Sequence, residues 1–211
     1  MANLIDKLHW LGQAGFVIRN GKVIYFDPYK IGATEKADLI LITHEHFDHC
    51  SPDDIMKIVQ PSTVIVTVPG NQAKLSSMAG QVSEIIFVKP GDTRTLKGIG
   101  IQVIPAYNVN KNFHPQSNMW AGFVIEVDGE KLYHAGDTDL LPDMSSIRCD
   151  IALLPVSGTY VMTAEEAAKA ADQIKPRIAI PMHYGDTVGD ESDARRFESL
   201  CECEVRILKK E

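Results

Sequence analysis

Four side chains that can bind metal ions, His44, His46, Asp48 and His49, lie within six consecutive residues. They directly follow the apolar run 39–43, which is typical of a buried strand. Side chains of an extended chain alternate in direction, so His44 and His46 point the same way and can bind one cation. Asp48 and His49 lie further along the loop and can reach a second cation. Imidazole and carboxylate suit zinc, iron and manganese, so the spacing H-x-H-x-D-H predicts metal binding without fixing the metal.

A two-metal site needs about six or seven donors from several segments, so this cluster requires partners from elsewhere in the chain. His114, Asp137 and His183 each stand where a strand-like run gives way to a loop. Such strand ends are where a rigid scaffold presents functional loops, and they are the candidate partners. His9 and His134 fall inside strand-like runs, and we interpret them as structural or as groups that orient the ligands.

Short runs rich in Val and Ile recur along the chain and predict strands. They cover residues 15–19, 22–26, 39–43, 63–67, 84–88, 101–105, 122–127, 131–134, 151–154, 177–180 and 204–208. Ser51, followed by proline and two acids, predicts a helix over 52–60. A capping box at Thr163 predicts an alanine-rich helix that Pro176 ends. Weaker patterns predict helices over 70–79 and 190–200.

The two halves of the chain open with the same pattern. Gly-Phe-Val-Ile at 15–18 precedes an Asn-Gly turn and a second apolar run, and the same four residues at 122–125 precede an Asp-Gly turn and another run. Both patterns are strong hairpin signals. Two such halves, each continuing with alternating strands and helices, predict a mixed α/β fold with two sheets packed face to face and helices outside. A chance resemblance of two common hairpins would leave this prediction intact.

Composition narrows the functional classes. The 211 residues, 45% of them hydrophobic, can bury one sizeable core, so we predict one domain over 1–211. Lys and Arg total 21 against 28 for Asp and Glu, and the net charge of −7 offers no basic surface for nucleic acid. The sequence shows neither an apolar run approaching the roughly 18 residues of a membrane span nor a secretion signal, so we expect a cytoplasmic protein without a membrane partner.

The four cysteines show no spacing of a disulfide framework. We interpret Cys201 and Cys203 as a helix end entering a last strand, with half of a metal site as the alternative. Cys50 adjoins the histidines, and we interpret it as a small packed neighbour, with metal ligation as the alternative.

The chain resembles the metallo-β-lactamase superfamily, whose members carry H-x-H-x-D-H followed by a further His, an Asp and a last His in that order. The resemblance covers nearly the whole chain. Residues 106–111, 133–139 and 180–185 look like a narrower branch of small metal-dependent hydrolases related to ascorbate-6-phosphate lactonase. The resemblance implies a four-layer αββα sandwich, the metallo-β-lactamase fold.

The resemblance also implies a role for each donor. One metal would be held by His44, His46 and His114, the other by Asp48, His49 and His183, with Asp137 bridging the two. Residues 10–15 look like the family's early glycine-bearing strand, but Gln13 stands where many relatives have His, which leaves its role open. The chain lacks the inserted domain with which RNA-cleaving members grip their substrate. Flavin-linked di-iron relatives carry Glu where this chain has His46.

The expected activity is hydrolysis. Two divalent ions about 3.5 to 4 Å apart, zinc first and manganese or iron as alternatives, would hold a bridging water as hydroxide and polarise the substrate. We expect a small-molecule substrate with an ester-type bond, either a lactone or a phosphoester. An iron-dependent oxygenase or other oxidoreductase on the same fold is one alternative, and a metal-binding protein without catalysis is another. The sequence makes no prediction of the oligomeric state.

Other side chains near the donors are candidates for catalysis and orientation. We assign catalytic roles to Asp48 and His134. His134, Asp27 and Asp139 are also candidates to orient the ligand imidazoles, because a ligating histidine usually donates its other N–H to a partner.

A polar stretch beside His114 is the candidate for substrate binding. Asn108, Asn110 and Lys111 could contact an anionic or polar group of the substrate. The alternative is that this stretch is only a solvated loop face.

Overall fold

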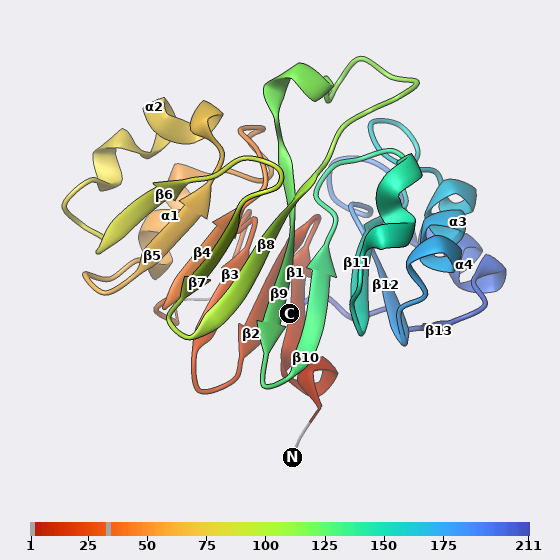
Figure 1. Ribbon diagram of the computed structural model, residues 1–211, viewed down its shortest axis with the longest axis horizontal. Coiled ribbons are helices and arrows are strands. Elements are labelled where there is room, and N and C mark those ends of the chain that lie inside the picture. Colours follow the sequence, from red (N-terminus) through yellow and green to blue (C-terminus); the bar gives the residue numbers. More distant parts are fainter. Residues whose placement is uncertain (1–2, 33–34) are drawn as a thin grey trace.

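Two mixed β-sheets form the centre of the computed structural model, which describes residues 3–32 and 35–211 (Figure 1). The six-stranded sheet runs in the order β1 (Leu8–Gly12), β2 (Gly15–Arg19), β3 (Val23–Phe26), β4 (Leu39–Ile42), β5 (Val64–Thr67) and β6 (Glu84–Phe87). The seven-stranded sheet runs in the order β13 (Glu204–Val205), β12 (Ile178–Met182), β11 (Ile151–Pro155), β10 (Glu130–His134), β9 (Ala121–Val127), β8 (Ile99–Pro105) and β7 (Thr93–Leu96). Both predicted hairpins are present, as the antiparallel pairs β2–β3 and β9–β10.

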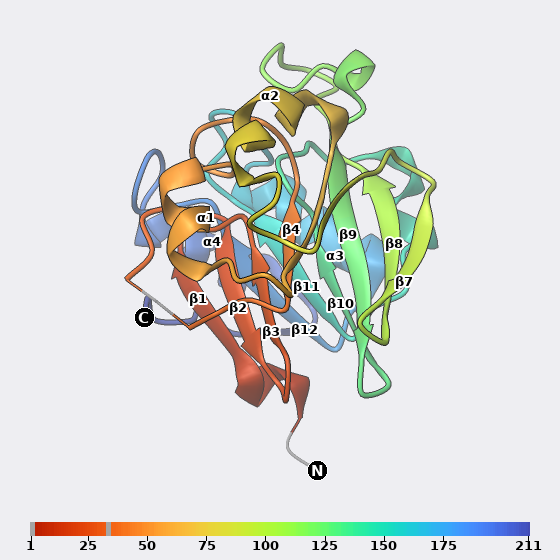
Figure 2. The same ribbon diagram turned by 90° about the vertical axis from the view of Figure 1, so that its left-hand side faces the viewer.

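The sheets pack face to face because their strands alternate between two apolar faces. In β2, Phe16 and Ile18 join the core between the sheets together with Phe123 of the other sheet, whereas Val17 joins a second core with Ile55. Helices α1 (Pro52–Ile58) and α2 (Gln72–Leu75) cover the outer face of the six-stranded sheet, to which Val17 belongs. Helices α3 (Ala164–Ile174) and α4 (Glu191–Leu200) cover the outer face of the seven-stranded sheet (Figures 1 and 2). The layers are therefore α, β, β, α, as predicted.

The start signals of the helices act as their chemistry suggests. Ser51 caps α1, and Thr163 and Glu166 form the capping box of α3. The prediction of one helix over 70–79 is wrong, because this stretch divides into two short 3₁₀ turns, Pro69–Asn71 and Ser76–Met78, on either side of the four-residue α2. None of the helices within the described ranges is long and apolar enough to cross a membrane.

Two strands are absent from the sequence prediction and one is shorter than predicted. β7 lies at the edge of its sheet with mostly exposed side chains, so it carries no apolar run. β1 is a buried edge strand that contains Trp10 and ends at Gly12. The predicted last strand over 204–208 pairs only as β13, after which Lys210 makes an isolated bridge to Trp10 of β1.

Backbone hydrogen bonds join the two sheets at the edge where β4 and β12 end. The amide of Ala121 at the start of β9 donates to the carbonyl of Thr43, 3.2 Å away, and the amide of His183 donates to the carbonyl of Gln13 at 2.9 Å. These bonds fix the loop 43–49 of one sheet against strand ends of the other. The connection 106–120 between β8 and β9 projects beyond the sheets at the top of Figure 1.

Candidate metal centre

The seven predicted donors come from four loops that meet at this edge. The loop after β4 supplies four of them, and the loops after β8, β10 and β12 supply one each. The structure gathers them into two groups, within each of which one donor atom per residue lies within 4.8 Å of the others. The first group is His44, His46, His114 and Asp137, and the second is Asp48, His49 and His183.

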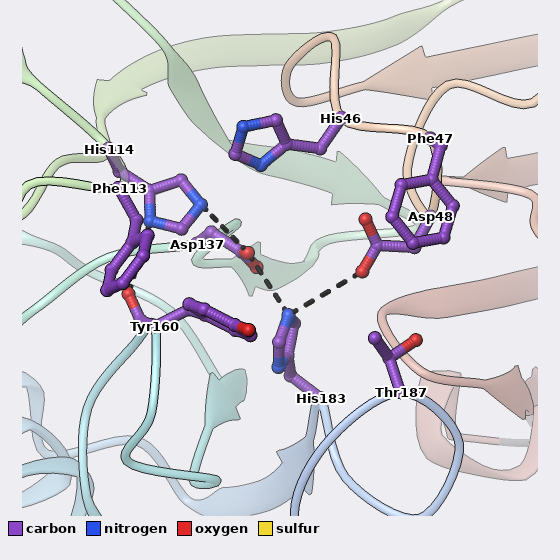
Figure 3. Close-up of a pocket in the computed structure, with 9 residues that line it drawn as sticks. All are labelled: His46, Phe47, Asp48, Phe113, His114, Asp137, Tyr160, His183 and Thr187. Carbon is purple, nitrogen blue, oxygen red and sulfur yellow. Dashed lines mark hydrogen bonds and ion pairs between the residues drawn. The ribbon is translucent and has the colours of Figure 1, made fainter.

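Asp137 lies between the two groups. Its Oδ2 atom is 3.1 Å from His114 Nε2 and also 3.1 Å from His183 Nε2, and its Oδ1 atom is 3.3 Å from His49 Nε2. In Figure 3 the imidazoles of His114 and His183 approach this carboxylate from opposite sides, and Asp48 faces His183. One carboxylate therefore contacts histidines of both groups, which is the placement that a bridging ligand requires.

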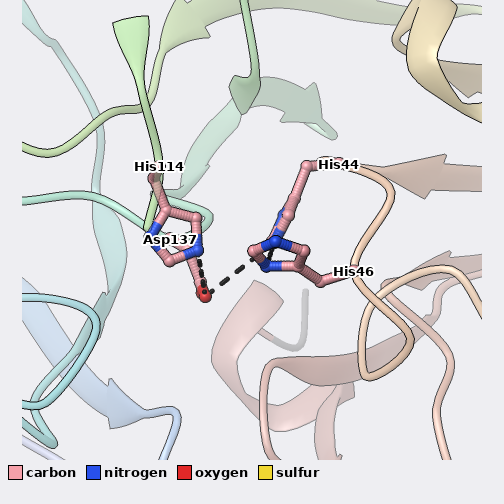
Figure 4. Close-up of side chains that lie close together, drawn as sticks. All are labelled: His44, His46, His114 and Asp137. Atoms are coloured by element: carbon pink, nitrogen blue, oxygen red, sulfur yellow. Dashed lines mark hydrogen bonds and ion pairs between the residues drawn. The ribbon is translucent and has the colours of Figure 1, made fainter. Parts of the chain in front are cut away.

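The donors fit divalent metal ions. His49 Nε2, His114 Nε2 and Asp137 Oδ1 are buried atoms without a hydrogen bond of acceptable geometry. Figure 4 shows His44, His46 and His114 gathered around Asp137. A buried polar atom left without a partner costs about 1–3 kcal/mol, so three such atoms in one site are best explained by a cation that binds them. Imidazole nitrogen and carboxylate oxygen suit zinc, manganese or iron.

Two of the imidazoles are oriented through the nitrogen that faces away from the donor cluster. His49 Nδ1 lies 2.8 Å from Asp27 Oδ2, and the same carboxylate accepts hydrogen bonds from the amide and the hydroxyl of Thr43. His183 Nδ1 lies 3.1 Å from Ser157 Oγ. Asp27 therefore makes the direct contact with His49 that its predicted orienting role requires. Such partners fix the ring orientation and leave Nε2 free to bind metal.

The third oriented imidazole, His114, shows what the polar stretch 108–111 does. Asn108 Oδ1 accepts from the amide of His114 at 2.9 Å and lies 3.1 Å from its Nδ1. Asn108 Nδ2 in turn donates to Asp139 Oδ1, and Lys111 Nζ donates to the same atom from 2.7 Å. Asp139 therefore acts on His114 through Asn108 rather than by direct contact.

Mutual contact sets the charges of the donors. Burial raises the pKa of Asp137, but the neighbouring histidines, His183 first, lower it more, so the pKa lies well below its usual value. Burial lowers the pKa of His44 well below its usual value. Burial also lowers the pKa of His49, but the surrounding carboxylates, that of Asp137 first, raise it by more. The pKa of His49 therefore lies well above its usual value. An ionised Asp137 beside a neutral His44 suits cation binding, and His49 would release a proton on binding.

The backbone bends sharply beside two donors. Gly136 has φ of +65°, and a Cβ atom there would lie 2.8 Å from the carbonyl oxygen of Ala121. His183 itself adopts φ of +61°, a conformation that non-glycine residues rarely take. Only glycine fits the turn before Asp137 without a clash, and the strained turn at His183 aims its ring at Asp137.

The structure does not support a catalytic role for His134, and Cys50 lies outside both donor groups. The Nε2 atom of His134 is 2.8 Å from the carbonyl of Ala14, its Nδ1 accepts from the amide of Gly136, and its ring stacks on Phe26. With both nitrogens engaged by the backbone and no exposed surface, it is a structural histidine that joins the two sheets. Cys50 packs in the core beneath α1, where burial raises the pKa of its thiol to about 12.

A cavity of about 210 Å³ opens over the donors (Figure 3). Its walls beyond the donors are Phe47, Phe113, Tyr160 and Thr187. None of the three predicted substrate-binding residues lines it. Asn108 and Lys111 are engaged with Asp139, and the side-chain NH₂ group of Asn110 donates to Glu166 Oε1 from 3.5 Å. No pattern in the sequence singles out the aromatic wall residues, since their neighbours in space come from other loops.

Gln13 contacts the second group directly. Its Nε2 atom donates to Asp48 Oδ2 at 2.9 Å, and its backbone at φ of +49° places its carbonyl to accept from the amide of His183. The side chain therefore holds one carboxylate donor in place. The sequence pointed to this position but left its role open.

Known proteins resemble this chain over nearly its full length. Residues 7–183 match the family described as a β-lactamase superfamily domain. A protein of Pelotomaculum thermopropionicum named UPF0173 metal-dependent hydrolase is 34% identical over 223 residues, with 96% of each chain covered. A crystal structure from Parabacteroides distasonis superposes with a TM-score of 0.84 at 32% identity, covering 96% of this chain and 93% of the other. Igni18, a metallo hydrolase of Ignicoccus hospitalis, superposes with a TM-score of 0.77 at 27% identity, covering 96% and 94%.

Proposed function

The chain belongs to the metallo-β-lactamase superfamily and, with its relatives, is a metal-dependent hydrolase; we propose that it works with two divalent ions, zinc first, on a small ester-type bond. The observation that carries the proposal is the position of Asp137, whose carboxylate contacts histidines of both donor groups. In this proposal His44, His46 and His114 hold one ion, and Asp48, His49 and His183 hold the other. Manganese or iron is the alternative metal.

The residues of the chain prepare the site for this chemistry. Two bound ions would supply a hydroxide nucleophile at neutral pH and polarise the scissile carbonyl or phosphoryl oxygen. Asp27 and Asn108 hold the rings of His49 and His114 so that Nε2 faces the centre. Asp48 lines the cavity, and Gln13 donates a hydrogen bond to its Oδ2 atom. We assign the Asp48 carboxylate the role of general base, which accepts the proton of the attacking water. No side-chain nucleophile is required.

Metal analysis and a substrate panel test the proposal together. The purified protein, stripped and reloaded with zinc or with manganese, is expected to bind two ions per chain and to hydrolyse members of a chromogenic panel of lactones, phosphodiesters and thioesters. His46→Ala and Asp137→Ala should each lower kcat/KM at least about 100-fold, because an ion and its polarising effect are lost. Circular dichroism should show an unchanged fold.

His9→Ala is the matched control. His9 lies outside both donor groups and contacts Glu211, so its loss should change neither metal content nor turnover. Full activity of the His46→Ala variant would overturn the proposal. One iron per chain together with oxygen uptake would favour the iron-dependent oxygenase instead.

A further inference from the structure

Two aromatic pairs flank the cavity over the donors. Phe113 and Tyr160 meet edge to face with their ring centroids 4.6 Å apart, and Tyr29 and Phe47 meet in the same way at 5.7 Å. Figure 3 shows Phe113 and Tyr160 on one side of Asp137 and Phe47 on the other. Edge-to-face contact is a favoured aromatic geometry, so each pair supports its own wall. The donors therefore lie between two apolar walls.

The wall rings are exposed to an extent that is unusual for phenylalanine. Phe47 is 60% exposed and Phe113 is 50% exposed, although both line the cavity. Apolar surface left in water at the mouth of a cavity is typical of a binding site, because a ligand that covers it removes that surface from water. The groups best able to cover these rings are themselves apolar.

The cavity also lacks a cationic wall. Its lining contains no lysine or arginine among the residues that the structure describes. Two lysines on neighbouring loops are paired with carboxylates: Lys111 Nζ lies 2.7 Å from Asp139 Oδ1, and Lys30 Nζ lies 2.7 Å from Asp186 Oδ1. Protein sites normally hold a phosphate or sulfate through such cations. An anionic group on the substrate, away from the reacting bond, would find no such partner here.

The volume of the cavity suits a small apolar group. A cavity of about 150 Å³ accommodates benzene, and this one measures about 210 Å³. It therefore has room for one aromatic ring, or an alkyl chain of similar bulk, next to a reacting ester.

We propose that the cavity selects substrates that carry one uncharged aryl or alkyl group beside the reacting bond, in preference to substrates with an anionic group at that place, with Phe47 and Phe113 as the specificity-determining residues. This inference rests on the proposed hydrolase function, and it names the kind of group that the substrate presents to the walls beside the reacting bond.

The test uses three inhibitors that share one metal-binding head. Acetohydroxamate, benzohydroxamate and 4-sulfobenzohydroxamate place a methyl, a phenyl and an anionic phenyl group against the walls. Calorimetric titration of the zinc-loaded protein should give a benzohydroxamate Kd at least about tenfold lower than that of acetohydroxamate, because one buried ring removes enough apolar surface from water for this ratio. The sulfonate should bind more weakly than benzohydroxamate.

Variants assign the selectivity to the walls. Phe113→Ala and Phe47→Leu should each reduce the phenyl-to-methyl ratio to about threefold or less, with zinc content unchanged. Met119→Ala is the matched control, because Met119 is 49% exposed on the same loop as Phe113 but does not line the cavity, so the ratio should stay as in the wild type.

The outcomes separate this inference from the function on which it rests. Zinc binding with a wild-type ratio below about threefold, or tighter binding of the sulfonate than of benzohydroxamate, would overturn the substrate class and leave the hydrolase function standing. A ratio that persists in both wall variants would also overturn it. A protein that takes up no metal would overturn the proposed function, and this inference with it.

Discussion

The substitution Asp27→Asn isolates the effect of orientation on a donor. Asp27 is fully buried, and its carboxylate accepts from the Thr43 amide at 2.8 Å and the Thr43 hydroxyl at 2.7 Å, with His49 Nδ1 at 2.8 Å. An asparagine side chain has the same shape, and its oxygen can still accept from the Thr43 amide. Its NH₂ group would then face His49 Nδ1, which must become an acceptor. The proton of the imidazole would move to Nε2, the atom that faces Asp137, and block it as a ligand.

The expected cost follows from this change of tautomer. Loss of a partner that orients a metal ligand typically lowers metal affinity 10- to 100-fold, which corresponds to about 1.4–2.7 kcal/mol. The loss should be larger for the ion held by Asp48, His49 and His183, because Asp27 contacts His49 directly and reaches His44 only through the Thr43 hydroxyl, 2.9 Å from His44 Nδ1. The fold should survive, since the amide replaces the carboxylate without adding volume.

Competition with a chromogenic zinc chelator at neutral pH measures both dissociation constants. We expect one to rise 10- to 100-fold and the other to rise less. Asp54→Asn is the matched control, because Asp54 is also buried and accepts hydrogen bonds from the backbone and from Lys57 but lies outside both donor groups. Wild-type affinity for both ions in Asp27→Asn, or an equal loss in Asp54→Asn, would refute the reasoning.

Four further predictions concern stability and metal content. Burial raises the pKa of Asp54, but the hydrogen bonds that it accepts, the one from Lys57 first, bring the pKa below its usual value. Asp54→Asn should therefore lower the free energy of unfolding by about 1–3 kcal/mol at pH 7. Urea titrations should show this difference shrinking as the pH falls below about 4 and the carboxylate of the wild type becomes protonated. Gly136→Ala should lower the free energy of unfolding by about 1–3 kcal/mol, because its Cβ would clash with the Ala121 carbonyl, and an unchanged thermal midpoint would contradict this. Asn108→Ala should lower the affinity for one zinc ion 10- to 100-fold, because His114 loses the partner of its Nδ1 atom. A raised KM with unchanged zinc affinity would instead mean that Asn108 binds substrate. A chelator should lower the thermal midpoint, since an ion present at 100 times its Kd stabilises by about 2.7 kcal/mol, and an unchanged midpoint would argue against metal in the folded protein.

The metal donors could be predicted from the sequence because they either lie close together along the chain or directly follow predicted strands. His44, His46, Asp48 and His49 lie so close together along the chain that core packing cannot account for them. The three distant donors were predicted from their place after strands, and the structure brings all of them to the same edge. The two similar hairpins, each followed by alternating strands and helices, likewise predicted two packed sheets.

The direction of loop side chains could not be predicted in the same way. Asn108 looked like a polar group available to substrate, but its side-chain NH₂ group donates to Asp139 and to the Tyr160 carbonyl, which come from other loops and turn it inward. His134 looked like an ionisable group near the donors, but the carbonyl of Ala14 from the opposite sheet engages it. In each case the partner that decides the role is distant in sequence. The wall residue Phe113 was missed for the same reason.

The metal centre also lies across the boundary between the two sheets. The loop 43–49 of the six-stranded sheet supplies four donors, and loops of the seven-stranded sheet supply the other three. Bound ions would therefore crosslink the sheets at the edge where the Thr43 carbonyl already accepts from Ala121 and the Gln13 carbonyl accepts from His183. These backbone bonds and the bound ions would therefore stabilise the same contact between the sheets. Metal loss should thus loosen the contact between the sheets at this edge while each sheet keeps its own ladder, a pattern that amide hydrogen exchange of the Ala121 and His183 amides can detect.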